Sequence, residues 1–517
     1  MKKYFIFAAL VTAGLLTSCS SSDDAISESP NSPIENDDNL GKVEIQLGVG
    51  TNATASTRGT GTVGGTDNST NIWDAQKVNV YMFEKGTLNL AMEQDPTDPT
   101  QQVAIYDAAE FVTPTGGTTN TGVAIQYAND AAGDPNLIVH KYYPIRGNFD
   151  FWGFYIDDAA AASAVNRNTN DNRTIEGVGT PANPATATEV TVPFVINGTQ
   201  DLMVAKTVLS DDEKTAIAAA DGGTAAEPVL TRIYSAHSAR ITGTNVDGVQ
   251  PNLSFQHLLT RLHFVIKGGN LKSCGWKDTN ADGVLDAAPA IGDVYTGVFV
   301  KAIRIKSKVS GKVVAAYTTA PASLLSWEAA TATDYLPAGA DADGRVFLDL
   351  KKKNATTKQL ETLFDGSGYA DDAAWIAALT VDGTDWDNFI VPTATNSTTF
   401  DEVPVGEALL VEPNVGSYVM EVVLGQRVLY LEDTQTTDTA GDESTYIVKE
   451  FEMTEANNQA FTIHSPLYDA DTAPNEVFEN GKSYKVTITV YGAEEIVVKT
   501  TLEQWTEVGT PVTVVTE

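Results

Sequence analysis

Cysteine is scarce in this 517-residue sequence, which contains only Cys19 and Cys274. Because two cysteines allow at most one disulfide, a disulfide framework is excluded, and the fold must be stabilised by its hydrophobic cores. Basic residues are also few, with 33 Lys and Arg against 68 Asp and Glu and a formal net charge of −35. This excess of negative charge repels nucleic acid and anionic lipid, so a nucleic-acid partner is excluded.

Long hydrophobic runs are absent as well. The N-terminal apolar run Tyr4–Leu16 follows Lys2 and Lys3, is too short to span a bilayer comfortably, and is typical of an export signal. It ends in Leu-Thr-Ser-Cys, which resembles the lipobox of bacterial lipoproteins, where the cysteine is lipidated and becomes the new N-terminus. We therefore expect a lipoprotein signal peptide over residues 1–19, with Cys19 as a lipid anchor to the outer membrane. An ordinary secretory signal with an incidental cysteine is the alternative.

A short alternating segment follows the signal. Its apolar residues recur with a period of two, as expected of a half-buried strand, and they are Val43, Ile45, Leu47 and Val49. The next residues are rich in Gly and Thr, with Arg58 as an isolated basic side chain. Because exposed, mobile chain can enter a protease cleft, we predict cleavage between Arg58 and Gly59 by a trypsin-like protease. Residues 20–58 would then be a tether and a removable propeptide strand.

Beyond residue 58 the sequence indicates β-structure almost throughout. Alternating or β-branched runs are separated by clusters of Gly, Asn, Asp, Thr and Pro. Helical patterns are short, at Asp211–Ala220 and Ala373–Leu379. This spacing favours antiparallel β-sandwiches over βαβ units. The predicted strands are Lys77–Phe83, Asn148–Ile156, Glu189–Ile196, Leu262–Lys267, Thr296–Lys308, Tyr418–Leu424, Ser483–Val490, Glu495–Leu502 and Pro511–Val515.

Residue patterns for catalysis or cofactor binding are missing. Residues 59–64 fit the pattern GxGxxG, but no helix follows, so a nucleotide site is rejected. His257 and His263 are predicted to share one face of a strand, where a core or interface role is favoured over a metal pair. We therefore predict a protein that is not an enzyme and that has no cofactor.

One stretch, KDTNADGVLD, matches the first part of a calcium-binding loop. Its oxygen ligands would be Asp278, Asn280, Asp282 and Asp286. The position of the bidentate glutamate holds Pro289 instead, which favours an ordinary Asp/Asn/Gly turn over a calcium site.

Several stretches taken together resemble a known family. In chain order they are Tyr142-Tyr143-Pro144, Phe149–Tyr155, Asp201–Ala205, Leu253–Phe264 and Tyr484–Val490. With the lipobox and the strand followed by Arg58, the chain resembles the fimbrillins, the major fimbrial subunits or type V pilins of Bacteroidales-type bacteria. The resemblance implies two tandem transthyretin-like antiparallel β-sandwich domains, which we place at residues 59–250 and 251–517, and a location in a cell-surface fimbrium.

The resemblance also implies removal of the first strand and assembly by donor-strand exchange. Its partners would be other copies of the chain, related fimbrial subunits and a processing protease. Removing the strand would leave an apolar groove and a backbone edge that binds another strand. The predicted donor is the C-terminal strand with Val508, Val512, Val514 and Val515. The alternative is that both strands are simply edge strands of their own domains.

Two functions are compatible with these sequence features. The first is a structural pilin that polymerises and supports cell adhesion. The second is a monomeric surface lipoprotein that binds glycan or another ligand through its long loops. Cleavage at Arg58 distinguishes them, because only the pilin needs the preceding strand to be removed.

Overall fold

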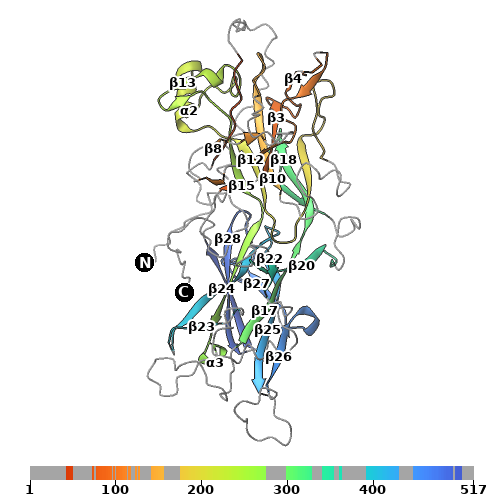
Figure 1. Cartoon of the computed structure of the whole chain (residues 1–517), viewed down its shortest axis with the longest axis vertical. Helices are drawn as coiled ribbons and strands as arrows, with labels where there is room; N and C mark the ends of the chain where they lie inside the picture. Colours follow the sequence, from red (N-terminus) through yellow and green to blue (C-terminus); the bar gives the residue numbers. More distant parts are fainter. Residues whose placement is uncertain are drawn as a thin grey trace, which may run out of the picture.

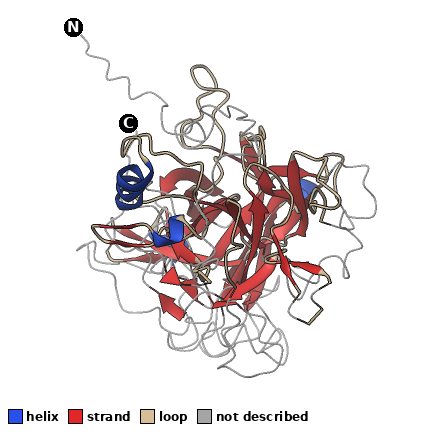
Figure 2. Cartoon of the chain, turned by 90° about the horizontal axis from the view of Figure 1, so that it is seen from above, coloured by secondary structure: helices blue, strands red, loops and turns tan. Residues whose placement is uncertain are grey.

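The computed structural model describes residues 42–50, 73–74, 77–95, 97–98, 100–112, 115–117, 123–124, 126–127, 141–156, 175–274, 298–328, 340–353, 360–363, 390, 392–396, 398–429, 446–492 and 495–503. These residues form an elongated, nearly all-β molecule with two halves stacked along its long axis (Figure 1). Viewed along that axis, strands fill the centre and the few helices lie at the periphery (Figure 2). The predicted all-β class is confirmed.

An eight-stranded sheet is the scaffold of the first half. Neighbouring strands are antiparallel except for β1 and β15, which run parallel. In spatial order the strands are β8 (Val123–Ala124), β1 (Gly48–Gly50), β15 (Asn252–His257), β12 (Leu202–Thr207), β10 (Phe149–Ile156), β3 (Lys77–Glu84), β6 (Ala109–Val112) and β9 (Gln126–Tyr127).

Both faces of this sheet are buried. In β3, Tyr81 and Phe83 join one hydrophobic cluster, whereas Val80 and Met82 join another, as the two-residue period of a strand requires. The first face packs against a three-stranded sheet of β11 (Glu189–Val195), β18 (Ser310–Tyr317) and β19 (Leu325–Trp327). The second face is covered in part by residues 208–251, which we call the cover segment.

The cover segment contains most of the helical structure of the first half. Its helix α2 (Asp211–Asp221) begins with a capping box, in which Ser210 Oγ accepts from the Glu213 N–H and the Glu213 carboxylate accepts from the Ser210 N–H. The helix is followed by the 3₁₀ turn η3 (Ser238–Arg240) and the hairpin of β13 (Thr242–Gly243) and β14 (Val246–Asp247).

The second half is a sandwich of two sheets. One sheet contains β23 (Thr393–Ala394), β24 (Phe400–Val411), β16 (Thr260–Gly268), β28 (Ser483–Gly492) and β29 (Glu495–Glu503). The other contains β20 (Arg345–Asp349), β17 (Val298–Lys308), β25 (Ser417–Leu429), β26 (Tyr446–Met453) and β27 (Phe461–His464). Pairing is antiparallel except between β16 and β28, so the predicted antiparallel order has one parallel exception in each half.

Short elements complete the described chain. Three two-stranded ribbons pair β2 (Trp73–Asp74) with β7 (Thr115–Gly117), β4 (Met92–Gln94) with β5 (Gln102–Ala104), and β21 (Lys351–Lys353) with β22 (Leu360–Thr362). The remaining helical turns are α3 (Leu271–Cys274) and η7 (Glu455–Asn457). No helix in the described ranges has the length and hydropathy needed to cross a membrane.

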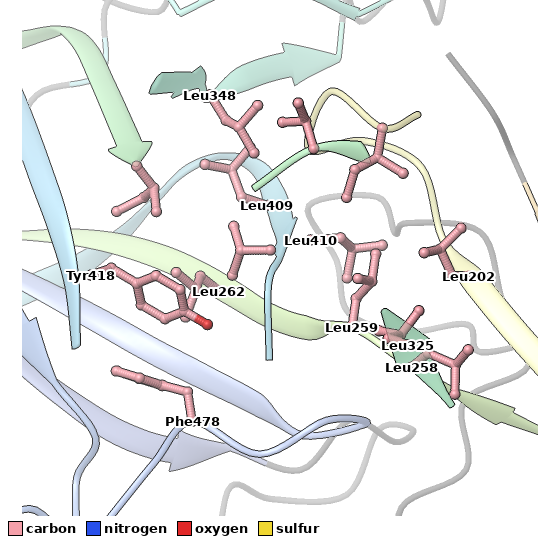
Figure 3. Close-up of a cluster of buried hydrophobic side chains, with 14 of the residues drawn as sticks. Leu202, Leu258, Leu259, Leu262, Leu325, Leu348, Leu409, Leu410, Tyr418 and Phe478 are labelled. Carbon is pink, nitrogen blue, oxygen red and sulfur yellow. The ribbon is translucent and has the colours of Figure 1, made fainter. Parts of the chain in front are cut away.

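One hydrophobic cluster continues through the junction of the two halves. Leucine side chains from both halves meet in this cluster (Figure 3). The first half and the link to the second contribute Leu202, Leu258, Leu259 and Leu325, and the second half contributes Leu348, Leu409 and Leu410. The Leu410 N–H donates to the Gly198 carbonyl at 2.8 Å. Gly198 has φ +95°, and a Cβ there would lie 2.8 Å from Leu409, so this contact requires glycine. The halves are therefore packed as one body.

The sheets do not follow a division of the chain at residue 250. β15 lies after that position but pairs with β12 in the first sheet, and the chain enters the second half only at Thr260. Residues 310–327 then return to the first half, because β18 pairs antiparallel with β11. The strand predictions on described residues are confirmed, as is the helix beginning at Asp211. The predicted helix Ala373–Leu379 and strand Pro511–Val515 lie outside the described residues.

Candidate functional site

The predicted propeptide strand is built into the first sheet, and we call residues 42–50 the inserted segment. Its first part pairs antiparallel with Lys141–Tyr143. The Ile45 N–H donates to the Lys141 carbonyl, and the Tyr143 N–H donates to the Val43 carbonyl, both at 2.9 Å. Glu44 lies opposite Tyr142 between these two bonds.

The second part of the inserted segment has a strand on either side. β1 pairs parallel with β15, where Gly48 lies opposite Asn252, and antiparallel with β8, where Gly48 lies opposite Ala124. The Gly48 N–H donates to the Pro251 carbonyl at 3.0 Å. The Gln46 N–H donates to Oε1 of the Gln250 side chain at 3.3 Å. The segment is therefore an interior strand of the sheet.

The apolar side chains of the inserted segment are buried as the alternation predicts. Ile45 is 6 % exposed, Leu47 5 % and Val49 0 %, whereas Gln46 is exposed. Together these three side chains contribute roughly 5–9 kcal/mol of burial free energy. They belong to the cluster that also contains Val78, Val80, Met82, Phe151, Leu253 and Phe255 of the sheet and Ala216, Ile217, Ile233 and Val249 of the cover segment.

Aromatic rings line the same cluster next to the paired residue Tyr143. The Tyr143 ring lies 6.3 Å from the rings of Phe149 and Phe151, and Phe151 lies 5.9 Å from Tyr234. Burial raises the pKa of Tyr143 well above its usual value, and the nearby phenols of Tyr234 and Tyr106 raise it further. The Tyr143 hydroxyl has no hydrogen-bond partner within the described part of the chain. Removing the inserted segment would therefore uncover an apolar, aromatic groove.

The walls of this groove are fixed from both sides. On one side, β15 continues through Leu258 and Leu259 into β16 of the second half. On the other, Lys141–Tyr143 leads directly into the central strand β10. The Lys141 ammonium also forms an ion pair with Glu93 of β4. Both walls thus belong to the scaffold and do not depend on the inserted segment for their chain connections.

The other predicted site residues lie outside the described part of the chain. They are the lipidation site Cys19, the cleavage site Arg58 and Gly59, the calcium candidates Asp278, Asn280, Asp282 and Asp286, and the donor residues Val508, Val512, Val514 and Val515. Within the described ranges, no group of three or more His, Cys, Asp and Glu side chains is placed to hold a metal ion.

The two histidines do not share a strand, and this prediction is wrong. His257 ends β15 in the first half, whereas His263 lies in β16 of the second, because Leu258 and Leu259 carry the chain through the junction. His257 is buried, and its Nδ1 lies 2.5 Å from Oδ2 of buried Asp201. The other carboxylate oxygen of Asp201 accepts from the Leu202 N–H at 2.8 Å. This pair belongs to the core at the junction.

Comparison with known proteins gives matches in structure only. No protein-family model and no curated protein sequence matches the chain. A protein from Parabacteroides distasonis named for cell adhesion has a TM-score of 0.34 at 10% identity, covering 91% of this chain and 98% of its own. A protein of the same description from Bacteroides uniformis has a TM-score of 0.33 at 12% identity, and the match covers 90% of this chain and 98% of that protein. The fimbrial anchor protein Mfa2 of Porphyromonas gingivalis has a TM-score of 0.27 at 6% identity, and the match covers 89% of this chain and 99% of that protein. Similarity at this level does not assign a function, and the inserted segment is the feature from which a function can be argued.

Proposed function

We propose that this protein is a structural subunit of a type V fimbria on the bacterial surface, where it polymerises and supports cell adhesion. The observation that carries the proposal is the inserted segment, a strand that occupies an interior place of a sheet and is followed in the sequence by a Gly- and Thr-rich stretch with an isolated arginine. It is exported as a lipoprotein through Cys19, and a protease cuts between Arg58 and Gly59.

Cleavage changes the inserted segment from part of the chain into a separate peptide. While the segment is attached, it binds its groove within the same molecule, so its effective concentration at the groove is high. Once it is cut, dissociation lets it diffuse away and opens the groove between β15 and Lys141–Tyr143. The groove then presents unpaired backbone groups and an apolar floor, both of which bind an extended strand.

The C-terminal strand of another subunit fills the groove in the assembled fimbria. Val508, Val512, Val514 and Val515 supply the apolar residues for this donor. Because the groove and the donor lie on different parts of one chain, each subunit accepts one strand and provides one. Such head-to-tail contacts do not close, so they produce filaments.

Removal of the inserted segment is tested by the N-terminal sequence of the protein in assembled material on cells. We expect it to begin at Gly59. An Arg58→Ala variant should reach the surface but remain monomeric, while Lys42→Ala, which removes a basic residue on the other side of the segment, should mature normally. Assembled filaments whose subunits keep residues 42–50 would contradict the proposal and favour the monomeric ligand-binding lipoprotein.

The donor is tested by charging the face that enters the groove. Val512→Asp with Val514→Asp should abolish polymers, because each buried, unpaired carboxylate costs several kcal/mol in an apolar site. The monomer should keep its melting temperature, since the strand acts between subunits. A lower melting temperature with unchanged polymerisation would show that this strand completes its own sheet.

A further inference from the structure

A two-stranded ribbon in the second half contains the longest run of basic residues in this acidic chain. We propose that this ribbon, formed by β21 and β22, binds the negatively charged surface of a neighbouring copy of the chain in the fimbria. The inference rests on the polymerisation proposed above and adds a second contact between subunits beside the exchanged strand. The ribbon lies in the second half close to the junction (Figure 1).

The ribbon carries positive charge that the subunit does not neutralise. The chain has 33 Lys and Arg against 68 Asp and Glu, and Lys351, Lys352 and Lys353 follow one another in β21. Lys352 forms an ion pair with Glu361 across the ribbon, with 3.6 Å between Nζ and Oε1. None of the ion pairs formed by the described residues includes Lys351. The ammonium of Lys351 is therefore available to an acidic partner.

One face of the ribbon combines this ammonium with an exposed apolar side chain. Lys351 lies opposite Thr362, and Leu360 precedes Thr362 by two residues, so these three residues share a face. Leu360 is 47 % exposed, and Thr362 is exposed as well. An acidic protein surface that docks on this face would neutralise the lysine and also remove the leucine from water.

The base of the ribbon is fixed to the core of the second half. Leu350 and Leu363 flank the ribbon in sequence, and each is 2 % exposed within the core cluster. Gly406 of β24 has φ +62°, and a Cβ there would lie 2.5 Å from the Lys351 carbonyl oxygen, so β21 lies directly against the backbone of β24. A surface that is held in place in this way loses little conformational freedom on binding.

A second copy of the chain supplies the complementary charge. Cleavage after Arg58 removes four basic and seven acidic side chains, so the cleaved subunit keeps most of its negative excess. Part of this excess lies between β4 and β5. Hydrogen bonds from Thr97 lower the pKa of Asp95, and hydrogen bonds from Thr100 lower the pKa of Asp98, so both carboxylates are ionised at neutral pH.

The contact would offset a repulsion that strand exchange alone leaves in place. Two subunits that are both strongly negative repel each other as they approach. At physiological salt the Debye length is about 8 Å, so an attraction between the ribbon and a neighbour acts only at close range. Its main effects should be on the association rate and on the salt dependence of assembly.

Charge reversal tests the ribbon. Lys351→Glu with Lys353→Glu should slow polymerisation of the Arg58-cleaved chain roughly three- to tenfold at low salt. Lys267→Glu with Lys499→Glu, on β16 and β29, changes the net charge equally and should stay within about twofold of the parent. At ~1 M salt, where the Debye length is about 3 Å, both variants should polymerise at the same rate. Equal slowing of both variants at low salt would overturn the proposal.

Carbodiimide cross-linking reads the contact in the unsubstituted chain. The reagent joins a lysine directly to a carboxylate that touches it, with no spacer between them. Fimbriae grown from mixed ¹⁴N- and ¹⁵N-labelled subunits should give mixed-isotope peptide pairs that link residues 351–353 to an acidic peptide, detected by mass spectrometry. Mixed-isotope pairs that link other lysines but never these three would overturn the proposal.

The ribbon can fail without the proposed function failing. If filaments form at the parent rate after charge reversal and no mixed-isotope pair includes the ribbon, the subunits meet elsewhere and strand exchange stands. If the chain is retained on dextran sulfate through Lys351 and Lys353 and gives no such pair, the ribbon is a site for an anionic polysaccharide, and the proposal is overturned. If the cleaved chain forms no filaments under any condition, the proposed function and the ribbon contact are both wrong.

Discussion

Leu47→Ala in the uncleaved precursor measures how firmly the inserted segment is held. The side chain is 5 % exposed and packs in the cluster of β3, β10 and β15, so its truncation removes buried methyl groups and leaves a cavity. Substitutions of this kind cost about 2–5 kcal/mol. The matched control is Gln46→Ala, whose side chain is exposed on the same strand, and it should change stability by less than ~0.5 kcal/mol.

The stability that Leu47→Ala loses in the precursor should also speed the release of the inserted segment once the chain is cut after Arg58. Losing 2–5 kcal/mol corresponds to a roughly 30- to 5,000-fold faster release of the cleaved segment, if the loss falls on the dissociation step. Urea denaturation of the precursor gives the first quantity, and the time course of the segment leaving the cleaved protein gives the second. Equal values for Leu47→Ala and Gln46→Ala would refute the reasoning, because the buried face would then contribute nothing.

Three further predictions concern other parts of the chain. Tyr143→Phe should be as stable as the parent at pH 7 and lose less stability above pH ~10, because the raised pKa of Tyr143 gives stability that is present below the unfolded-state pKa and lost as pH rises. Tyr418→Phe should instead destabilise the protein by ~1–3 kcal/mol at pH 7, since it removes the 2.6 Å hydrogen bond to the Glu412 carbonyl. Urea denaturation measures the stability of both variants. Cys19→Ser should abolish lipid labelling and surface display, and unchanged labelling would show that the lipobox assignment is wrong. Calorimetry should show calcium binding weaker than micromolar, and a tighter affinity that Asp278→Ala abolishes would contradict this.

The sequence predicts the local properties of the inserted segment but not its neighbours. The alternation of Val43, Ile45, Leu47 and Val49 identifies a strand and its buried face, and the structure confirms this burial for the last three. The pairing with β15 and with Lys141–Tyr143 joins residues far apart in the chain, and no local pattern encodes such pairings. Gln250 is an ordinary polar residue before a strand, so nothing in its surroundings in sequence marks it as an acceptor for Gln46.

The error at the histidines has a similar origin. A period of two across residues 257–263 predicts one continuous strand with both imidazoles on one face. The chain instead leaves the first sheet after His257 and enters the second at Thr260, and the two leucines between them fill the junction core. Apolar residues at a junction and apolar residues within a strand have the same composition, so the sequence cannot separate them.

The position of the inserted segment explains why its loss should open a site and not collapse the sheet. The segment precedes all other described residues, so its departure breaks no chain connection, and among the described strands of the sheet only the two-residue β8 loses its pairing. β15 stays paired with β12 and continues into the second half, where the junction core fixes its end. Lys141–Tyr143 is tied to β10, which pairs with both β12 and β3. Closing the groove would require these walls to move together against two packed cores. In the proposed exchange, a donor strand would therefore meet a preformed site, and the cleaved segment and the donor would compete for the same hydrogen bonds and the same buried face.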